Sequence, residues 1–248
     1  MVIRMKRPKM IMFDYGQTLI FEERFDGLKG MKAVLKHARS NPYQVSAREV
    51  QEFSKTLDRE IGRFDPDVRK SHHVEVHNHL FQNYLYQYFG LEIDLTPGEI
   101  ERVFWDNAAQ KKPTEHIQEL LAFLRSEGIR SGVISNISFS GMALEERLRE
   151  LLPEHEFEFI LATSEFVFRK PHPRIFELAL RKAHLDAREV WYCGDNAYFD
   201  VEGAFRAGIY PIWYRGAIDS ENKISPDSTC LTINDWMELI NYLSDDSI

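Results

Sequence analysis

The segment MIMFDYGQTL, residues 10–19, joins a short apolar run to a polar turn. Within it, the stretch Lys9–Phe13 predicts a strand, because a brief apolar run bounded by turn residues is typical of a strand buried in a sheet. Asp14 follows directly, so the strand would carry a carboxylate to the point where it ends. The segment therefore predicts both a strand and a candidate functional position at its carboxyl end.

The sequence after residue 110 alternates between helical and strand patterns. Helices are expected from Thr114 to Gly128, around Leu144–Leu151, and over Pro173–His184, Tyr198–Ala207 and Asp235–Leu243. Strands are expected over Arg130–Ile134, Phe157–Leu161, Glu189–Cys193, Ile209–Tyr214 and Leu231–Ile233. This alternation predicts an α/β fold with a doubly wound parallel sheet that carries helices on both faces. In such sheets, ligand sites lie at the carboxyl ends of the strands.

Residues 28–110 interrupt this alternation with a purely helical pattern. Their apolar periodicity predicts four helices without a strand signal between them, which is typical of a small α-helical bundle. We therefore expect an α/β core domain made of residues 1–22 and 111–248, and a smaller helical domain made of residues 23–110. The two links between these parts are expected to act as hinges that let the smaller domain close over the site.

The composition is that of an ordinary globular protein. The 248 residues are 44% hydrophobic and 28% charged, which excludes a disordered chain, a collagen-like fibre and a disulfide scaffold. The net charge of −8 argues against nucleic acid or an anionic membrane surface as the main partner. Two cysteines, Cys193 and Cys230, and the lack of an apolar run near 20 residues favour a cytoplasmic protein that is not inserted in a membrane.

Polar side chains gather in the loops that follow the predicted strands. They are Asp14, Ser135 and Asn136, Lys170, and Asp195, Asn196 and Asp200. Each residue alone is more often a helix cap, a turn residue or a solvated charge. Together they match the needs of phosphoryl transfer. Carboxylates hold Mg²⁺, a lysine and a hydroxyl stabilise and position phosphoryl oxygens, and one carboxylate can act as the nucleophile.

The chain resembles the haloacid dehalogenase (HAD) superfamily of hydrolases. The resemblance lies in four motifs in the expected order: Asp14–Leu19, Ser135-Asn136, Lys170–Phe176, and Gly194-Asp195 with Asp200, Gly203-Ala204 and Ala207–Ile209. The helical block of residues 23–110 resembles the α-helical cap that this family inserts after the first motif. The resemblance implies a Rossmann-like core that carries a helical cap.

The resemblance also implies a metal site. Asp14 would be both the nucleophile and a ligand of Mg²⁺, and the main-chain carbonyl of Gly16 would be a second ligand. Asp195 would complete the site, and Asp200 would either bind the metal through water or orient Lys170. Few direct protein ligands are expected, because Mg²⁺ usually keeps several waters.

The remaining motif residues would hold the phosphoryl group. By the same resemblance, Ser135 would bind the phosphoryl oxygens, with Asn136 beside it. Lys170 would neutralise both the nucleophile and the phosphate. Thr18 and Asn196 are expected to support the site from the motifs of Asp14 and Asp195.

Gly16 departs from the pattern of the family's phosphatases, which carry a second aspartate at this position. That aspartate protonates the leaving alkoxide and then activates water. Thr18 and Leu19 keep their spacing from Asp14, so a shift by one residue does not restore the motif, and Gln17 replaces the usual glycine. The loss of a general acid and base costs about 10²–10⁴ in rate.

Several explanations of Gly16 stay open. The substrate could have a good leaving group, as in acyl or aryl phosphates, or a cap side chain or water could supply the acid. The bond broken could be C–P or C–halogen, since phosphonate and haloacid hydrolases of the family also lack this aspartate. The protein could also be a weakly active or non-catalytic binder of a phosphorylated metabolite.

The expected function is a Mg²⁺-dependent phosphatase or phosphotransferase that acts on a small phosphorylated metabolite through an aspartyl-phosphate at Asp14, as a monomer or homodimer. A separate cluster of histidines, His72, His73, His77 and His79, is expected to be solvated or to face the substrate. A zinc site is the alternative, since His73 and His77 would share one face of a helix.

Overall fold

The computed structural model describes residues 6–63, 65, 67–68, 73–217 and 225–245. A six-stranded sheet with the order β10-β9-β8-β1-β6-β7 forms its centre, and every neighbouring pair is parallel. The strands are β1 (Met10–Phe13), β6 (Arg130–Ser135), β7 (Phe157–Ala162), β8 (Val190–Gly194), β9 (Tyr210–Tyr214) and β10 (Leu231–Ile233). The predicted α/β class and parallel sheet are confirmed.

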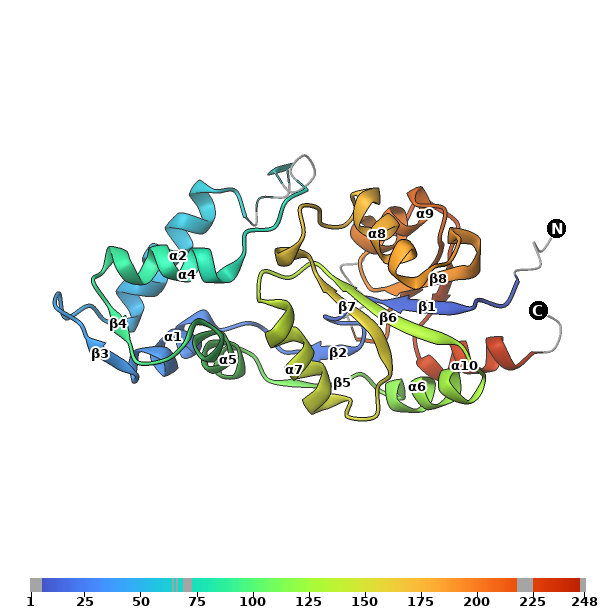
Figure 1. Cartoon of the computed structure of the whole chain (residues 1–248), viewed down its shortest axis with the longest axis horizontal. Helices are drawn as coiled ribbons and strands as arrows, with labels where there is room; N and C mark the ends of the chain where they lie inside the picture. The colour runs from blue at the N-terminus through green and yellow to red at the C-terminus, as the bar shows by residue number, and fades with distance from the viewer. Residues whose placement is uncertain (1–5, 64, 66, 69–72, 218–224, 246–248) are drawn as a thin grey trace.

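Helices cover both faces of this sheet (Figure 1). One face packs against α6 (Ile117–Ser126), α7 (Gly141–Leu151) and α10 (Trp236–Ser244), and the other against α8 (Pro173–Ala183) and α9 (Gly203–Arg206). The shorter turns are η1 (Thr163–Glu165), η2 (Ala187–Glu189) and the π-helical turn η3 (Ala197–Glu202).

Strand β1 is buried on both faces because its side chains alternate. Ile11 and Phe13 join the hydrophobic cluster under α6, α7 and α10, whereas Met10 and Met12 join the cluster under α8. All four side chains are fully buried, and each contributes about 1.5–3 kcal/mol to the stability of the fold. The apolar run therefore fixes β1 between β8 and β6, and Asp14 is carried to the edge where these strands end.

The helical block forms a separate hydrophobic cluster. It contains α1 (Gly27–Leu35), α2 (Ala47–Glu60), α4 (Asn78–Tyr88) and α5 (Pro97–Ala108). Two short strands, β3 (Ala38–Ser40) and β4 (Glu92–Ile93), pair antiparallel within it, so the prediction of helices alone was wrong here. Strands of two or three residues are too short to produce a periodic signal. The division into domains at residues 22 and 110 stays a prediction.

The two links between the helical block and the sheet lie side by side. β2 (Ile20–Glu22) pairs antiparallel with β5 (Lys111–Pro113). Thr114, expected to cap the next helix, instead donates its hydroxyl to the Thr18 carbonyl at 2.8 Å, and His116 takes the N-cap position of α6. The return link is therefore tied directly to the turn that follows Asp14.

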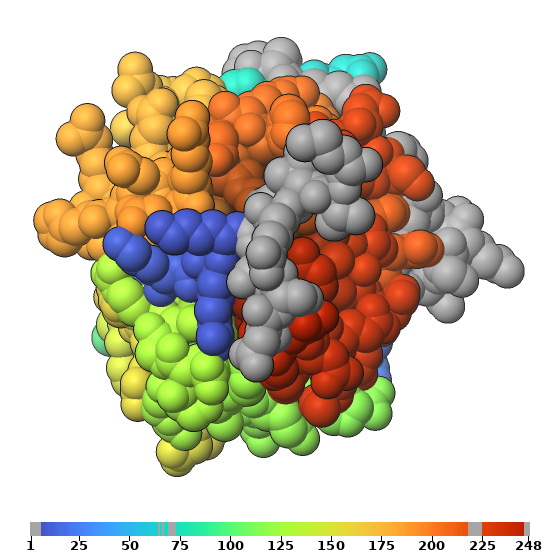
Figure 2. Space-filling model, turned by 90° about the vertical axis from the view of Figure 1, so that its right-hand side faces the viewer, coloured from blue at the N-terminus to red at the C-terminus, as the bar shows by residue number. Residues whose placement is uncertain are grey.

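The end of the molecule remote from the helical block is closed by packed segments. Figure 2 shows the first described residues of the chain emerging there, between the segments coloured green and orange. No helix among the described residues is long and apolar enough to cross a membrane. The sheet lies beside the helical block (Figure 1), and Asp14 lines one cavity together with residues of that block.

Candidate active site

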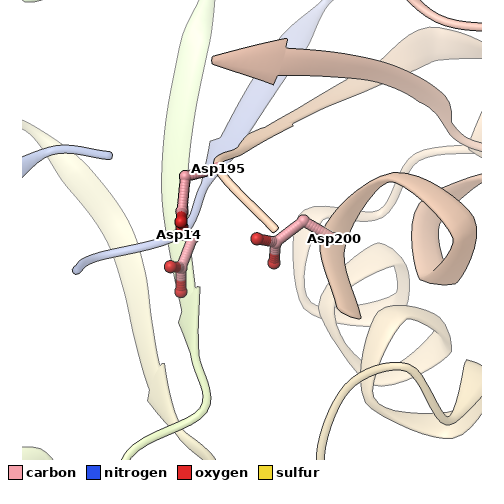
Figure 3. Close-up of side chains that lie close together, drawn as sticks. All are labelled: Asp14, Asp195 and Asp200. Carbon is pink, nitrogen blue, oxygen red and sulfur yellow. The ribbon is translucent and has the colours of Figure 1, made fainter. Parts of the chain in front are cut away.

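Three aspartates meet where neighbouring strands end. Asp14 follows β1, Asp195 follows β8, and Asp200 lies in η3 and points its carboxylate back toward the other two (Figure 3). One carboxylate oxygen from each residue lies within 4.8 Å of one from each of the others. The structure thus brings together the three acidic residues that the sequence placed in separate motifs.

Lys170 lies at the centre of this cluster. Its Nζ donates to Asp14 Oδ1 at 2.7 Å, to Asp200 Oδ1 at 2.6 Å and to the hydroxyl of Tyr192 at 2.7 Å. The side chain is almost fully buried, so all three protons of the ammonium group are held by protein acceptors. Asp200 therefore contacts Lys170 directly, and its two expected roles, binding the metal through water or orienting Lys170, stay predictions.

Asn136 fixes the backbone of Lys170. Its side-chain amide donates to the Lys170 carbonyl and accepts from the Lys170 N–H, both at 2.8 Å. Both ends of the amide are therefore used to position the lysine. A role of the Asn136 side chain in binding phosphate stays a prediction. Ser135, the last residue of β6, is buried and lines the same cavity.

The charges of the cluster favour an added cation. Burial raises the pKa of Asp14 to about 6, although Lys170 acts against this shift. Burial also raises the pKa of Asp195 well above its usual range, and the charges of Asp200 and Asp14 add to the effect. Burial alone would lower the pKa of Lys170, but Asp14 and Asp200 outweigh it and the pKa is raised. The charges of three carboxylates, those of Asp14, Asp195 and Asp200, are thus offset in this cluster by the single ammonium group of Lys170.

A divalent cation fits this donor set. The donors are all oxygen atoms, which are the ligands that Mg²⁺ prefers, and two positive charges would balance the excess of carboxylates. Gly16 lines the same cavity, as expected for a residue that offers its carbonyl to the metal. These roles stay predictions.

Neighbouring residues hold Asp195 and Asp200 in place. The Asn196 N–H donates to Asp200 Oδ2 at 2.9 Å, and the Asn196 side chain accepts from the first N–H groups of η3. Thr18 is buried, and its hydroxyl lies 3.5 Å from Asp195 Oδ1. Position 194 requires glycine because the Asp200 side chain lies close to its backbone, and an added Cβ would lie 2.3 Å from Asp200 Cγ.

The site opens into a cavity of about 590 Å³. All the predicted catalytic, phosphate-binding and metal-binding residues line it: Asp14, Gly16, Ser135, Asn136, Lys170, Asp195 and Asp200. At Gly16 there is open space, since an added Cβ would meet no atom within 4 Å. Gln17 beside it has a φ of 55°, a conformation that glycine adopts more easily.

Several groups at this site could not be predicted from the sequence. Tyr192 lies inside β8 and was assigned only as part of a strand, and its hydroxyl donates to the Ile134 carbonyl at 2.9 Å. Arg169, which directly precedes the motif of Lys170, is buried, lines the cavity and pairs with Glu75 at 2.9 Å. Sequence spacing also gave no signal for the phenylalanine and tryptophan rings that line the cavity, which are Phe25, Trp105, Phe139 and Phe199.

The histidine cluster does not form the predicted helical face. Helix α4 begins only at Asn78, and His77 is its N-cap residue, so the prediction that His73 and His77 share a helix was wrong. His79 pairs with the buried Glu101 at 2.9 Å. His72 lies outside the described residues. Within the part of the chain that the structure describes, the three aspartates are the only acidic, histidine or cysteine cluster with metal-site spacing.

Comparisons with known proteins agree with the four motifs. The model of a family described as haloacid dehalogenase-like hydrolase matches residues 11–214. The chain is 24% identical over 214 residues to the glyceraldehyde 3-phosphate phosphatase of Pyrococcus abyssi, and the match covers 84% of this chain and 81% of that protein.

Solved structures show the same fold. The 2-haloacid dehalogenase of Pseudomonas syringae pv. Tomato DC3000 superimposes with a TM-score of 0.66 at 23% identity, over 96% of this chain and 98% of that one. A HAD phosphatase of Thermococcus onnurineus gives a TM-score of 0.63 at 19% identity, over 96% and 99%. At these identities, the likeness concerns the fold alone.

Proposed function

The chain belongs to the haloacid dehalogenase-like hydrolases, and we propose that it is a Mg²⁺-dependent phosphatase that acts on a small phosphorylated metabolite through an aspartyl-phosphate at Asp14. The observation that carries the proposal is the position of Lys170. Its Nζ lies 2.7 Å from Asp14 and 2.6 Å from Asp200, within a cluster of three carboxylates that fits a divalent cation.

In this proposal, each group has a separate task. Asp14 attacks phosphorus, and Lys170 keeps the attacking carboxylate ionised and offsets the charge of the phosphoryl oxygens. The hydroxyl of Ser135 binds those oxygens, and Asn136 holds Lys170 in position. Mg²⁺, held by Asp14, Asp195 and the Gly16 carbonyl, would supply further charge stabilisation.

The relatives support a phosphatase that acts on a small molecule. The matched protein of Pyrococcus abyssi is a glyceraldehyde 3-phosphate phosphatase. We propose that residues 23–110 form a cap that closes over the cavity, because Phe25, Arg63, Glu75 and Trp105 of this block line the cavity together with the strand-end aspartates.

Two alternatives from the sequence remain to be tested. The carboxylate cluster favours phosphoryl transfer over metal-independent cleavage of a C–halogen bond, which needs no cation. The second alternative is a weakly active or non-catalytic protein that binds a phosphorylated metabolite. The observation that favours it is Gly16, which leaves open space where phosphatases of the family carry a second aspartate.

The test is a hydrolysis screen with aryl, acyl and sugar phosphates, with and without Mg²⁺. We expect metal-dependent release of phosphate that Asp14→Asn abolishes. Asp94→Asn, at an exposed carboxylate far from the site in the sequence, is the matched control and should keep full activity. No metal-dependent turnover of any substrate would contradict the proposal. Thermal stabilisation by phosphate without turnover would identify a binding protein, with a shift of about 2.7 kcal/mol at a hundredfold excess over Kd.

A further inference from the structure

The loop that follows β6 carries groups that are proposed to handle phosphate. It comprises residues 136–140 and continues directly from Ser135, the last residue of β6, into α7. Its first residue, Asn136, holds the backbone of Lys170 through two hydrogen bonds. A shift of this loop would therefore disturb both the proposed phosphate ligand Ser135 and the support of Lys170.

On one side, this loop is held by η1, which follows β7. The Ile137 carbonyl accepts from the Ser164 N–H at 3.2 Å, and the Phe139 carbonyl accepts from the Ser164 hydroxyl at 2.6 Å. Ser164 and the loop belong to neighbouring strand ends of the sheet. The next polar groups of the loop take their partners from the helical block instead.

The helical block contacts the other side of the loop through two helices. The Asn78 N–H, at the start of α4, donates to the Ser138 carbonyl at 2.8 Å. Glu101, in α5, accepts from the Ser140 hydroxyl at 2.5 Å and from the Ser140 N–H at 3.2 Å. The Asn78 amide donates to the same carboxylate at 3.1 Å, and His79 Nε2 lies 2.9 Å from it. Glu101 thus joins α4 and α5 to the end of the loop.

Glu101 completes a helix cap that α7 cannot complete by itself. In a capping box, the N-cap hydroxyl accepts from the N–H of the third helical residue, whose carboxylate accepts from the N-cap N–H. Ser140 makes the first of these bonds, with the Ala143 N–H at 3.2 Å, but alanine has no group for the second. Helices α2 and α5 carry Glu49 and Glu99 at that position and form complete boxes. In α7 the carboxylate comes from the helical block, so this contact forms only while the block is docked.

The burial of Glu101 shows that the contact is a specific one. Its side chain is fully buried, and burial of a carboxylate is costly unless donors surround it. Ser140 and Asn78, which supply the donors, are buried as well. Glu101 lies outside the lining of the cavity that holds the aspartates, so any effect of this residue on the site must pass through the loop.

From these contacts, we propose that Glu101 is a positioning residue that holds the loop of residues 136–140, and with it Ser135, in the arrangement that binds phosphate. The inference rests on the proposed phosphatase function and adds to it a residue outside the cavity. While the helical block is docked, the loop is held from both sides. Once the block moves away, the loop keeps only its bonds to η1. Phosphate binding therefore depends on the docking of the block.

The first test measures the Kd of inorganic phosphate by titration calorimetry in the presence of Mg²⁺. Glu101→Met keeps a side chain of similar length but removes both acceptor oxygens, and it should weaken phosphate binding about tenfold, the equivalent of one hydrogen bond. Glu101→Gln keeps one acceptor oxygen and should lie between Glu101→Met and the wild type. The Kd of Mg²⁺ alone should not change, because Asp14 and Asp195 lie on other loops.

Val50→Ala is the matched control. Val50 is fully buried in the hydrophobic cluster of the helical block, so its truncation should lower the unfolding temperature without changing the Kd of phosphate. Equal phosphate binding by Glu101→Met and the wild type, or equal weakening by Val50→Ala, would overturn the inference. Metal-dependent release of phosphate by the wild type would leave the phosphatase function intact in either case. A wild type that neither binds phosphate nor releases it would contradict the phosphatase function, and the inference would fall with it.

The second test approaches the same contact from the loop. Ser140→Ala removes the hydroxyl that donates to Glu101, and it serves also if Glu101→Met does not fold. If both side chains act through one contact, the double variant should weaken phosphate binding by less than the product of the two single effects. Fully multiplicative effects would show that Glu101 acts by another route and would overturn the inference.

The third test measures hydrogen exchange in a peptide that spans residues 136–140. The Ser140 N–H donates to Glu101, so exchange in this peptide should be faster in Glu101→Met than in the wild type. Val50→Ala should leave the exchange of this peptide unchanged. Wild-type exchange in folded Glu101→Met would show that the loop does not depend on Glu101, which would contradict the inference without reference to activity.

Discussion

The floor of the cavity and its walls are built in opposite ways. The floor is made of the charged side chains of Asp14, Lys170, Asp195 and Asp200 near the strand ends. Lys170 binds Asp14 and Asp200, and Asp200 also accepts from the backbone N–H of Asn196. The walls are made of aromatic rings from helices and loops, namely Phe25, Trp105, Phe139 and Phe199, of which Trp105 and Phe139 stack on each other. We therefore expect the proposed chemistry of the site to depend on a few fixed contacts, and the proposed choice of substrate to depend on the packed rings.

The largest effect is expected from Lys170→Met, which removes the one ammonium in the floor. Asp14 and Asp200 would then remain buried with no cation between them, and the loss of one partner from a buried ion pair typically costs about 3–5 kcal/mol. Urea unfolding without added metal measures this change, and phosphate release should fall to background. Lys182→Met, at an exposed lysine of α8, is the control. Wild-type stability in Lys170→Met would show that the floor does not depend on this contact.

A smaller effect is expected from Asn136→Ala, which leaves Lys170 in place but removes both hydrogen bonds to its backbone. Unfolding should become easier by about 1–3 kcal/mol, because the N–H and carbonyl of Lys170 lose their amide partners. The kcat should fall more than KM rises if Asn136 acts by positioning the lysine. A change in KM alone would instead indicate that Asn136 contacts the substrate directly.

The floor should also respond to pH. The pKa of Asp14 is raised to about 6, so without metal the folded state holds this proton more tightly than the unfolded state. That contribution to the free energy of unfolding is lost as pH rises toward about 6, and above this value Asp14 is ionised and can bind a cation.

Below about pH 6, Mg²⁺ must displace the proton of Asp14, and the affinity for Mg²⁺ should fall about tenfold per pH unit, or 1.4 kcal/mol. Titration calorimetry with Mg²⁺ at several pH values measures this slope, and Asp14→Asn should weaken it. A constant affinity would contradict the assignment of Asp14 as a ligand.

The smallest effect is expected in the wall. Trp105→Phe keeps an aromatic ring beside Phe139 but removes buried area, and it should reduce stability by about 1 kcal/mol. Because Trp105 makes none of the floor's contacts, the affinity for Mg²⁺ should not change. A clear loss of Mg²⁺ affinity in Trp105→Phe would remove the distinction between the two regions.

The same distinction explains what the sequence could predict. Asp14, Asp195 and Lys170 could be predicted as neighbours because each lies in a loop after a recognisable strand and because strand ends converge in a parallel sheet. Trp105 could not be identified as a cavity residue, since a ring at a helical spacing has the same pattern whether it faces a core or a cavity, and Phe139 lies in the loop before α7, where no periodic pattern indicates its direction. Asn136 shows a further limit, because its amide suits either a phosphate or a backbone, and only the fold determines which it contacts.

The paired links of the helical block have a mechanical consequence. Since β2 and β5 form one antiparallel ribbon, with Phe21 opposite Lys112, the block cannot swing on two independent pivots. We expect any motion of the block relative to the sheet to occur by twisting and bending of that ribbon. A deletion of one residue in either strand would shift the pairing and turn the side chains beyond it to the opposite face. If the block closes over the cavity as proposed, we expect the register of these three residue pairs to set the direction of closure.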